Sequence, residues 1–243
     1  MADGIYVALS GAIAQSASLE TTATNLANAS TDGYQGTRTL FREELTRAGS
    51  REPGMHYAGA SDALTDTTRG PLRATGGALD FAMPEGTYLA VSTPAGERYT
   101  RAASLSVAQD GSLRTAHGSA VVDEAGKPIQ VTNNPTTLRV DATGKLWQGD
   151  ESRGQVKLVT FAKPAALTHE AGALLVATPA SGAPTPSPGP LELGQVEGSN
   201  ANVVSAMTSL IDASRTFEAF QRVIDAFRDA DRAAVSQVPS TTG

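Results

Sequence analysis

The chain has 243 residues, of which 40% are hydrophobic and 18% charged, and its formal net charge is −6. The acidic balance and the lack of any basic cluster argue against a nucleic-acid partner, and the lack of an apolar run of about 18 residues argues against membrane insertion. Without cysteine the chain has no disulfide, no thiolate nucleophile and no cysteine metal site. The start of the chain lacks the basic region of a secretory signal, so we expect no cleaved signal peptide.

The first stretch with a clear pattern runs from residue 4 to residue 28. Its apolar and small side chains recur at alternating steps of four and three residues, which is typical of a helix that packs lengthwise on another helix. Glu20 is the only charged side chain in this stretch, so we expect other helices to enclose it. The amides of Asn25 and Asn28, followed by a turn sequence at 30–33, predict that the helix ends near residue 28. The positions of this seam are Ile5, Leu9, Ala12, Ser16, Leu19, Ala23 and Leu26.

The next stretch, from residue 34 to residue 76, has no sustained period. Glycines interrupt it repeatedly and charges of both signs are mixed along it, which predicts an extended linking arm. Within this arm, residues 39–48 have the composition of a short helix. A connection of about 40 residues is long for a compact domain, and such lengths usually serve function or docking.

From residue 77 to residue 178 the period changes to two, the period of strands. Short apolar runs alternate with turn sequences such as Pro94–Gly96 and Gln109–Gly111, which predicts an antiparallel β domain of hairpins. The prolines that crowd residues 179–190 cannot continue a hydrogen-bonded ladder, so residues 179–198 are interpreted as a stiff return linker. The candidate strands are 88–92, 105–107, 120–122, 138–140 and 156–161.

The last helix is predicted from residue 199 to about residue 238, with Ser199 or Asn200 as its N-cap and Pro239 as its stop. Its outer face carries charged pairs such as Glu218 and Arg222. Its apolar seam repeats the steps of the first helix, which predicts that the two ends of the chain pair. The seam positions are Val203, Met207, Leu210, Ser214, Phe217, Gln221 and Ile224, with Phe220 and Phe227 alongside.

Together these elements predict an α+β protein. Its N- and C-terminal helices form a coiled-coil-like pair, and between them lie an extended arm and a central antiparallel β domain. Because the first helix has few large apolar side chains for its length, we expect neighbouring subunits to complete its packing. The predicted parts are an N-terminal assembly helix (1–33), a linking arm (34–76), a β domain (77–178), a return linker (179–198) and a C-terminal assembly helix with its tail (199–243).

Motifs near both ends are similar to those of one protein family. Residues 24–34 combine an asparagine-rich helix end with a glycine–aromatic turn, residues 70–82 resemble the family's entry into its β domain, and residues 196–202 and 214–218 resemble its C-terminal motif. The sequence therefore resembles the axial proteins of the bacterial flagellum, which are rod, hook and hook-associated subunits. The matched positions are Asn25, Leu26, Asn28, Thr31, Gly33, Tyr34, Glu197, Ser199, Asn200, Asn202 and Arg215.

This resemblance implies a structural role without chemistry. Such subunits pass through the flagellar export apparatus and assemble in the periplasm into the tubular rod of the basal body, which transmits torque from rotor to hook. The implied partners are copies of this chain, other rod subunits and the export apparatus. The single modest β domain favours the proximal rod type, with a distal rod or hook-type subunit as the alternative. The departures that bear on this choice are Asp32, Ala201 and Phe220, where the family usually has Pro, Val and Asn.

An enzyme is the first competing interpretation. His56, His117 and His169 are far apart in the sequence and none has the spacing of a metal ligand, so they are interpreted as surface or loop residues. Asp80 and Asp110 are interpreted as turn or strand-end carboxylates rather than as an acid–base pair. No phosphate-binding loop follows the glycines at 76 and 77. The sequence therefore predicts no catalytic residue, no cofactor and no metal.

A binding module is the second competing interpretation. In that case the β domain would bind a cell-wall or protein ligand while the helices present it, and Trp147 and Tyr99 would be candidate contacts. Packing in the core or at a sheet edge is the simpler role for both side chains.

Overall fold

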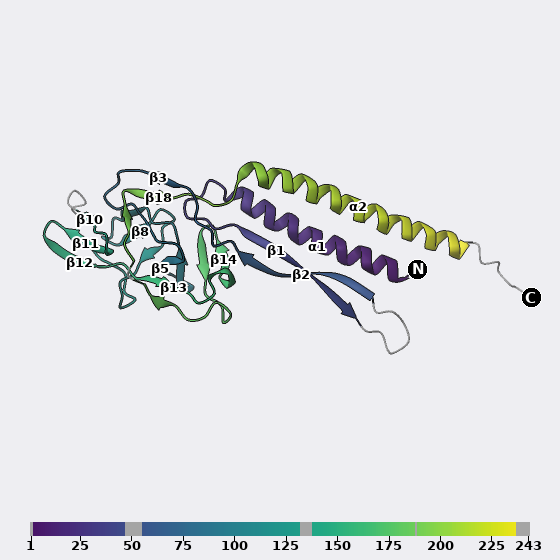
Figure 1. Ribbon diagram of the computed structural model, residues 1–243, viewed down its shortest axis with the longest axis horizontal. Coiled ribbons are helices and arrows are strands. Elements are labelled where there is room, and N and C mark those ends of the chain that lie inside the picture. The colour runs from purple at the N-terminus through teal and green to yellow at the C-terminus, as the bar shows by residue number, and fades with distance from the viewer. Residues whose placement is uncertain (1, 47–54, 132–137, 188, 237–243) are drawn as a thin grey trace, which may run out of the picture. The chain divides into compact units, whose positions relative to one another are not determined.

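The computed structural model describes residues 2–46, 55–131, 138–187 and 189–236. The chain divides into two compact units (Figure 1). The helical unit consists of Met1–Leu26, Arg38–Ala63 and Val203–Gly243, and the β unit consists of Ala27–Thr37 and Leu64–Asn202. Each unit is thus assembled from segments that are far apart in the sequence.

The helical unit is built on α1 (Ala2–Ala27) and α2 (Val203–Ser236), which lie side by side and antiparallel (Figure 1). Glycines of α1 face phenylalanines of α2. A Cβ added at Gly4 would lie 2.7 Å from Phe227 Cζ, and one added at Gly11 would lie 2.5 Å from Phe220 Cε1. Both pairs repeat at the spacing of one heptad. The terminal helices therefore pack together, and the predicted α+β class with a helix pair and a central antiparallel β region is confirmed.

The arm forms a two-stranded sheet, in which β1 (Thr37–Thr46) pairs with β2 (Met55–Thr65). Thr39 Oγ1 on β1 donates a hydrogen bond to Thr21 Oγ1 on α1 over 2.9 Å. The short helix expected over residues 39–48 is therefore wrong for the described part of that stretch, and its last residues lie outside the described residues. Strand pairing with a later segment overrides local helix propensity, and composition alone does not reveal it.

The β unit contains short strands in several sheets. The largest has nine strands; its main order is β14-β15-β6-β5-β9-β8-β7, with β13 beside β5 and β16 beside β13. A three-stranded sheet (β10-β11-β12) and two-stranded sheets (β17-β4 and β18-β3) complete the unit. Their bounds are β3 (Leu72–Ala74), β4 (Phe81–Ala82), β5 (Thr87–Thr93), β6 (Gly96–Thr100), β7 (Leu105–Val107), β8 (Leu113–Thr115), β9 (Ala120–Val121), β10 (Leu138–Val140), β11 (Lys145–Gln148), β12 (Glu151–Gln155), β13 (Leu158–Thr160), β14 (Thr168–Ala171), β15 (Leu174–Val176), β16 (Thr185–Pro186), β17 (Glu192–Leu193) and β18 (Gln195–Glu197), with a 3-10 turn at Pro164–Ala166.

Strand β5 separates two hydrophobic clusters. Leu89 and Val91 belong to one cluster, and Tyr88 and Ala90 belong to the other, because successive side chains of a strand point to opposite faces of the sheet. All four residues are fully buried. The pairs that flank β5 are antiparallel, and the turn into β6 places Gly96 at φ +110°, a conformation that favours glycine. Each of the predicted strand ranges overlaps a strand of the structure.

The return segment differs from its prediction. It was expected to leave the ladder, but Pro186 lies opposite Val159 in the sheet and the Ser187 amide donates to Leu158 O over 3.0 Å. Strands β17 and β18 then pair with β4 and β3. Prolines at alternate positions leave the inward-facing amides free to bond, which is why the segment joins the sheet.

The last helix begins at Val203, so the expected N-cap at Ser199 or Asn200 is wrong. Both residues are used in the segment that precedes the helix. The predicted end near residue 238 lies outside the described residues. Neither helix of the described chain combines the length and apolarity needed to cross a membrane.

Candidate functional site

Family-motif residues from both ends of the sequence meet in the β unit. The Gly33 amide donates to Glu197 O over 2.7 Å, and the Asn200 amide donates to Tyr34 O over 3.2 Å. Residues 65–70 and 101–102 pack around the same place. We call this set of segments, residues 28–36, 65–70, 101–102 and 196–200, the junction.

The side chain of Asn200 ties the junction segments together. Its Oδ1 accepts the Gly36 amide over 2.6 Å, while its Nδ2 donates to Asp66 O over 2.8 Å and to Thr68 O over 2.9 Å. The carboxamide supplies an acceptor and two donors at once, which neither a carboxylate nor a hydroxyl can do. Asn200, which was expected to cap the last helix, therefore connects separate loops through its side-chain hydrogen bonds.

A buried ion pair lies at the centre of the junction. The side chains of Arg101 and Glu197 are only 1% and 2% exposed. Arg101 Nε donates to Glu197 Oε1 over 2.9 Å, and Arg101 Nη2 forms a further short contact with Oε2. The remaining donors of the guanidinium reach Thr87 O at 2.7 Å, Pro84 O at 3.1 Å and Met83 O at 3.2 Å. Because each charge is both paired and hydrogen-bonded, the cost of burying it is offset.

Two backbone positions of the junction require glycine. Gly33 has φ +68°, and a Cβ there would lie 2.2 Å from the Ala102 amide nitrogen. A Cβ at Gly70 would lie 2.1 Å from Gly198 O, and the Gly70 amide donates to Glu197 Oε1 over 3.1 Å. The Gly–aromatic turn of the sequence motif is thus a place where two chain segments touch backbone to backbone.

Aromatic side chains close the junction on the side of β14. Tyr34 is 1% exposed, and its ring centroid lies 5.0 Å from that of His169. Next to it, Tyr88 donates to Gln35 Oε1 over 3.1 Å. Burial raises the pKa of both Tyr34 and Tyr88 above the ordinary value, so both phenols stay neutral at physiological pH.

Stability should decrease on mild acidification because of His169. Burial lowers the pKa of this imidazole, so the unfolded chain takes up a proton at a higher pH than the folded chain does. The contribution of His169 to the free energy of unfolding is fully present above its ordinary pKa of about 6.5. This contribution decreases as the pH falls from there towards the folded-state pKa. Thermal unfolding between about pH 8 and about pH 5 checks this window. His169→Gln should flatten the slope and the exposed control His117→Gln should keep it; equal slopes would contradict the assignment.

Other motif residues lie around this centre. The Thr31 hydroxyl donates to Asn28 Oδ1 over 3.3 Å, and the Ser199 hydroxyl accepts the Ala201 amide over 3.1 Å. These contacts are local turns. The remaining matched positions are Asn25 and Leu26, which are half-buried on α1, and Asn202 and Arg215, which are exposed.

In the helical unit, the buried stripe of α1 runs one residue earlier than the predicted seam. It includes the half-buried Gly4 and the buried Ala8 and Gly11, small residues that permit close approach of another helix. Of the predicted seam, Ala12 is buried and Ile5, Leu19, Leu26, Leu210, Ser214, Phe217 and Ile224 are half-buried.

Three large apolar residues of the predicted seam are exposed in the single chain. Leu9 is 46% exposed, Val203 42% and Met207 50%, and their role in the assembly seam stays a prediction. Ser16, Ala23 and Gln221 are exposed as well.

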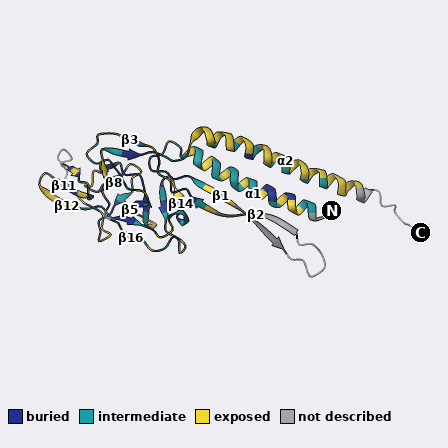
Figure 2. Ribbon diagram, in the orientation of Figure 1, coloured by how far each residue is buried: buried dark blue, intermediate teal, exposed yellow. Residues whose placement is uncertain are grey.

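The helix pair instead presents large apolar side chains to solvent. Yellow sections of α1 and α2 in Figure 2 mark the exposed positions of both helices. We call this set the apolar surface. All of its α1 members lie in the first half of that helix, and Ile13 is the most exposed of these at 61%. Single exposed apolar residues are ordinary, but a larger number of them on one pair of helices is unusual for a surface that stays in water. The apolar surface comprises Tyr6, Val7, Leu9, Ile13, Val203, Val204, Met207, Ile211 and Val223.

The groups considered for catalysis or ligand binding have structural partners. Asp110 accepts hydrogen bonds from Ser112 and Arg114, which hold its pKa at about 2. Asp80 accepts from the Thr75 and Ser104 hydroxyls over 2.6 Å and 2.8 Å. Among the described residues, no group of three or more His, Asp or Glu side chains is placed to hold a metal ion. The side chain of His56 lies outside the described part of the structure.

The two candidate ligand contacts of the β domain are engaged as well. Trp147 Nε1 donates to Asp141 over 2.9 Å, and the Arg139 guanidinium lies 5.8 Å from the centre of the indole ring. Tyr99 is 5% exposed and its hydroxyl donates to Glu97 over 2.9 Å.

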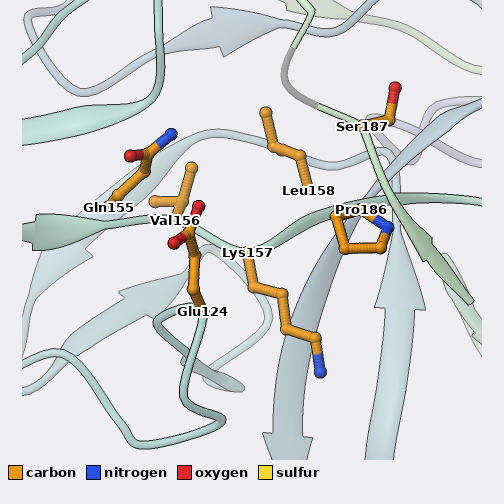
Figure 3. Close-up of a pocket in the computed structure, with 7 residues that line it drawn as sticks. All are labelled: Glu124, Gln155, Val156, Lys157, Leu158, Pro186 and Ser187. Carbon is orange, nitrogen blue, oxygen red and sulfur yellow. The ribbon is translucent and has the colours of Figure 1, made fainter.

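One pocket of the β unit lies beside β13 and β16 (Figure 3). Val156, Leu158 and Pro186 line it, with Glu124 at one side. The Lys157 ammonium in its lining lies 2.8 Å from Glu97 Oε2, which is outside the lining. The pocket is therefore a hollow whose lysine is already held by a carboxylate.

The comparisons with known proteins agree with the resemblance along the chain. Residues 5–35 match the family described as flagella basal body rod protein, residues 85–147 match the flagellar hook protein FlgE/F/G D1 domain, and residues 192–237 match the flagellar basal body rod FlgEFG protein C-terminal family.

Curated relatives match over most of their length. The flagellar basal-body rod protein FlgF of Mesorhizobium japonicum is 33% identical over 227 residues, covering 90% of each chain. FlgF of Escherichia coli is 34% identical over 243 residues, covering 94% of this chain and 95% of that protein. FlgG of Agrobacterium fabrum is 29% identical, covering 90% and 93%.

The family matches in both terminal segments and in the β unit place the chain in the class of structural axial subunits of the flagellum. Within this class, the chain belongs to the flagellar basal-body rod protein family and is of the FlgF type. It is thus a structural subunit of the rod.

Proposed function

We propose that this rod subunit polymerises through its terminal helix pair, binding copies of itself and other rod and hook subunits in the periplasm. In the assembled rod it transmits torque from rotor to hook. The proposal includes delivery by the flagellar export apparatus and no catalytic step. The observation that carries it is the apolar surface, because α1 and α2 expose several large apolar side chains that a solitary helix pair leaves in water.

The composition of α1 supports a role inside an assembly. Glu20 is its only charged side chain after Asp3, so most of its exposed face lacks the charges that an isolated surface helix carries. The exposed face of α2 carries charges in the second half of the helix, with ion pairs such as Arg228 with Asp225 and Arg232 with Asp229. The first helix is thus suited to a layer enclosed by neighbours, and the second to a layer that is partly in water.

The stiffness that torque transmission needs has a structural basis within each unit. In the helical unit, Phe220 and Phe227 fill the space left by Gly11 and Gly4, so a change in helix register would require both aromatic rings to move. In the β unit, the bonds of Asn200 and of the Arg101–Glu197 pair fix several loops at once.

Ile13→Asp tests the proposal. Because Ile13 is 61% exposed, the variant should keep the helix content and melting temperature of the parent chain. A charge on an apolar contact should nevertheless prevent incorporation into rods, since burying it unpaired costs several kcal/mol. The measurement is motility, together with the amount of this subunit in isolated basal bodies, in a strain that lacks the parent gene.

Ala219→Asp is the matched control. It adds the same charge at an exposed position on the charged face of α2, so incorporation and motility should be retained. Normal rods with Ile13→Asp would overturn the assignment of the apolar surface to assembly.

A further inference from the structure

The outer strand of the nine-stranded sheet, β16, contains one proline and directly follows another, Pro184. In the sequence, prolines occupy 184, 186, 188 and 190. Among the described residues, β16 pairs only with β13, so it is an edge strand. No charged residue occurs between Ala171 and Leu191, so the edge segment has no charge of its own to keep another strand away.

The register decides which way each amide points. Thr185 lies opposite Thr160 and Pro186 lies opposite Val159, and the Ser187 amide donates inward to Leu158 O over 3.0 Å. Successive residues of a strand direct their backbone groups to opposite sides. Thr185 and Ser187 therefore face β13, while Pro184 and Pro186 face away from the sheet.

We propose that Pro184 and Pro186 close this edge against strand addition by a second copy of the chain. The outward positions offer carbonyl acceptors but no amide donor, and a strand added there would lose half of each pair of ladder bonds and meet the proline rings. The inference does not depend on the proposed function, since it concerns the β unit alone.

Two other edge strands of the β unit, β12 and β14, use different protection. Strand β12 carries Glu151 and Arg153 and has Gly154 at φ +135°, and β14 carries Glu170 in an ion pair with Arg98. Charged side chains and irregular backbone commonly prevent exposed edge strands from pairing with another chain.

The test is the double variant Pro184→Thr/Pro186→Thr in the full chain. Threonine suits a strand and restores both outward amides. We expect this variant to associate more strongly than the parent chain in sedimentation velocity, to an extent that increases with protein concentration. The new amides of residues 184 and 186 should exchange hydrogen slowly, and their protection should increase with protein concentration. Pro94→Thr, at an exposed turn position between β5 and β6, should sediment like the parent.

A second variant separates strand addition from misfolding. Pro184→Thr/Pro186→Lys restores the same amides but adds a charge to the edge, so it should return to the sedimentation of the parent chain. Equal association of both double variants would overturn the proposal, because an unfolded edge rather than an open one would then be the cause. Absence of association in Pro184→Thr/Pro186→Thr, with near-ultraviolet circular dichroism unchanged, would also overturn it.

Discussion

Replacing Glu197 by alanine is expected to lower the free energy of unfolding of the β unit by about 3–5 kcal/mol, the usual cost of removing one partner of a buried ion pair. The variant leaves the Arg101 guanidinium 1% exposed with no counter-charge, and it leaves the Gly70 amide without its acceptor. Denaturant unfolding monitored by the single tryptophan, Trp147, in the same unit measures the loss.

The exposed ion pair between Arg73 and Asp32 supplies the control. Its side chains are 61% and 35% exposed, so Asp32→Ala should change the free energy of unfolding by no more than about 1 kcal/mol. The double variant Arg101→Met/Glu197→Leu should recover part of the loss, since no charge is then buried. Recovery stays incomplete because the carbonyls of Met83, Pro84 and Thr87 lose their donors. If Glu197→Ala and Asp32→Ala lowered the free energy of unfolding by similar amounts, the buried Arg101–Glu197 pair would contribute no more to stability than an exposed pair.

The helices and most of the sheet were predictable because their signals are local. A period near 3.6 in residues 4–28 and a period of two in residues 88–92 each follow from side-chain direction within one element. The helix expected at 39–48 failed because its partner strand, β2, comes later in the chain, and a ladder between separate segments leaves no local trace. The same limit applies to Thr185, which joins the sheet although prolines flank it.

The junction was only partly predictable. Its motif residues Gly33, Tyr34 and Asn200 were singled out by resemblance, but their bonds were not foreseen. Arg101 was missed as a site residue because a charged side chain is normally exposed, and its partner Glu197 lies 96 positions away. The sequence signal of such a backbone contact is the glycine–aromatic turn at Gly33 and Tyr34, together with the second motif around Gly198.

The predicted seam on α1 lies one residue after the positions that contact α2. The reason is that a hydrophobic pattern identifies large apolar side chains but not the glycines against which such side chains pack. Gly4 and Gly11 carry no apolar side chain, yet the rings of Phe227 and Phe220 lie directly against them. The signal that could have found them is a pair of glycines at heptad spacing matched by a pair of phenylalanines, 220 and 227, at the same spacing.

Gly11→Leu is therefore expected to separate the helix pair. Leucine is the better helix former by about 1 kcal/mol, so α1 itself is not weakened. Its Cβ would nonetheless lie 2.5 Å from Phe220 Cε1, and the rest of the side chain requires the ring to leave its place. Hydrogen exchange should show fast exchange along α1 with unchanged protection in the β unit, and the subunit should no longer enter the rod.

The rescue distinguishes packing from a general defect. Gly11→Leu/Phe220→Ala moves the bulky side chain from α2 to α1 and should restore most of the protection, with a coupling between the two sites of about 0.5–3 kcal/mol. Ser16→Leu adds the same side chain at an exposed position of α1 and should leave the exchange pattern as it is in the parent chain. If both single leucine variants exchange alike, Gly11 has no particular role, and the register of the helix pair must be set by other residues such as Phe217 and Ile224.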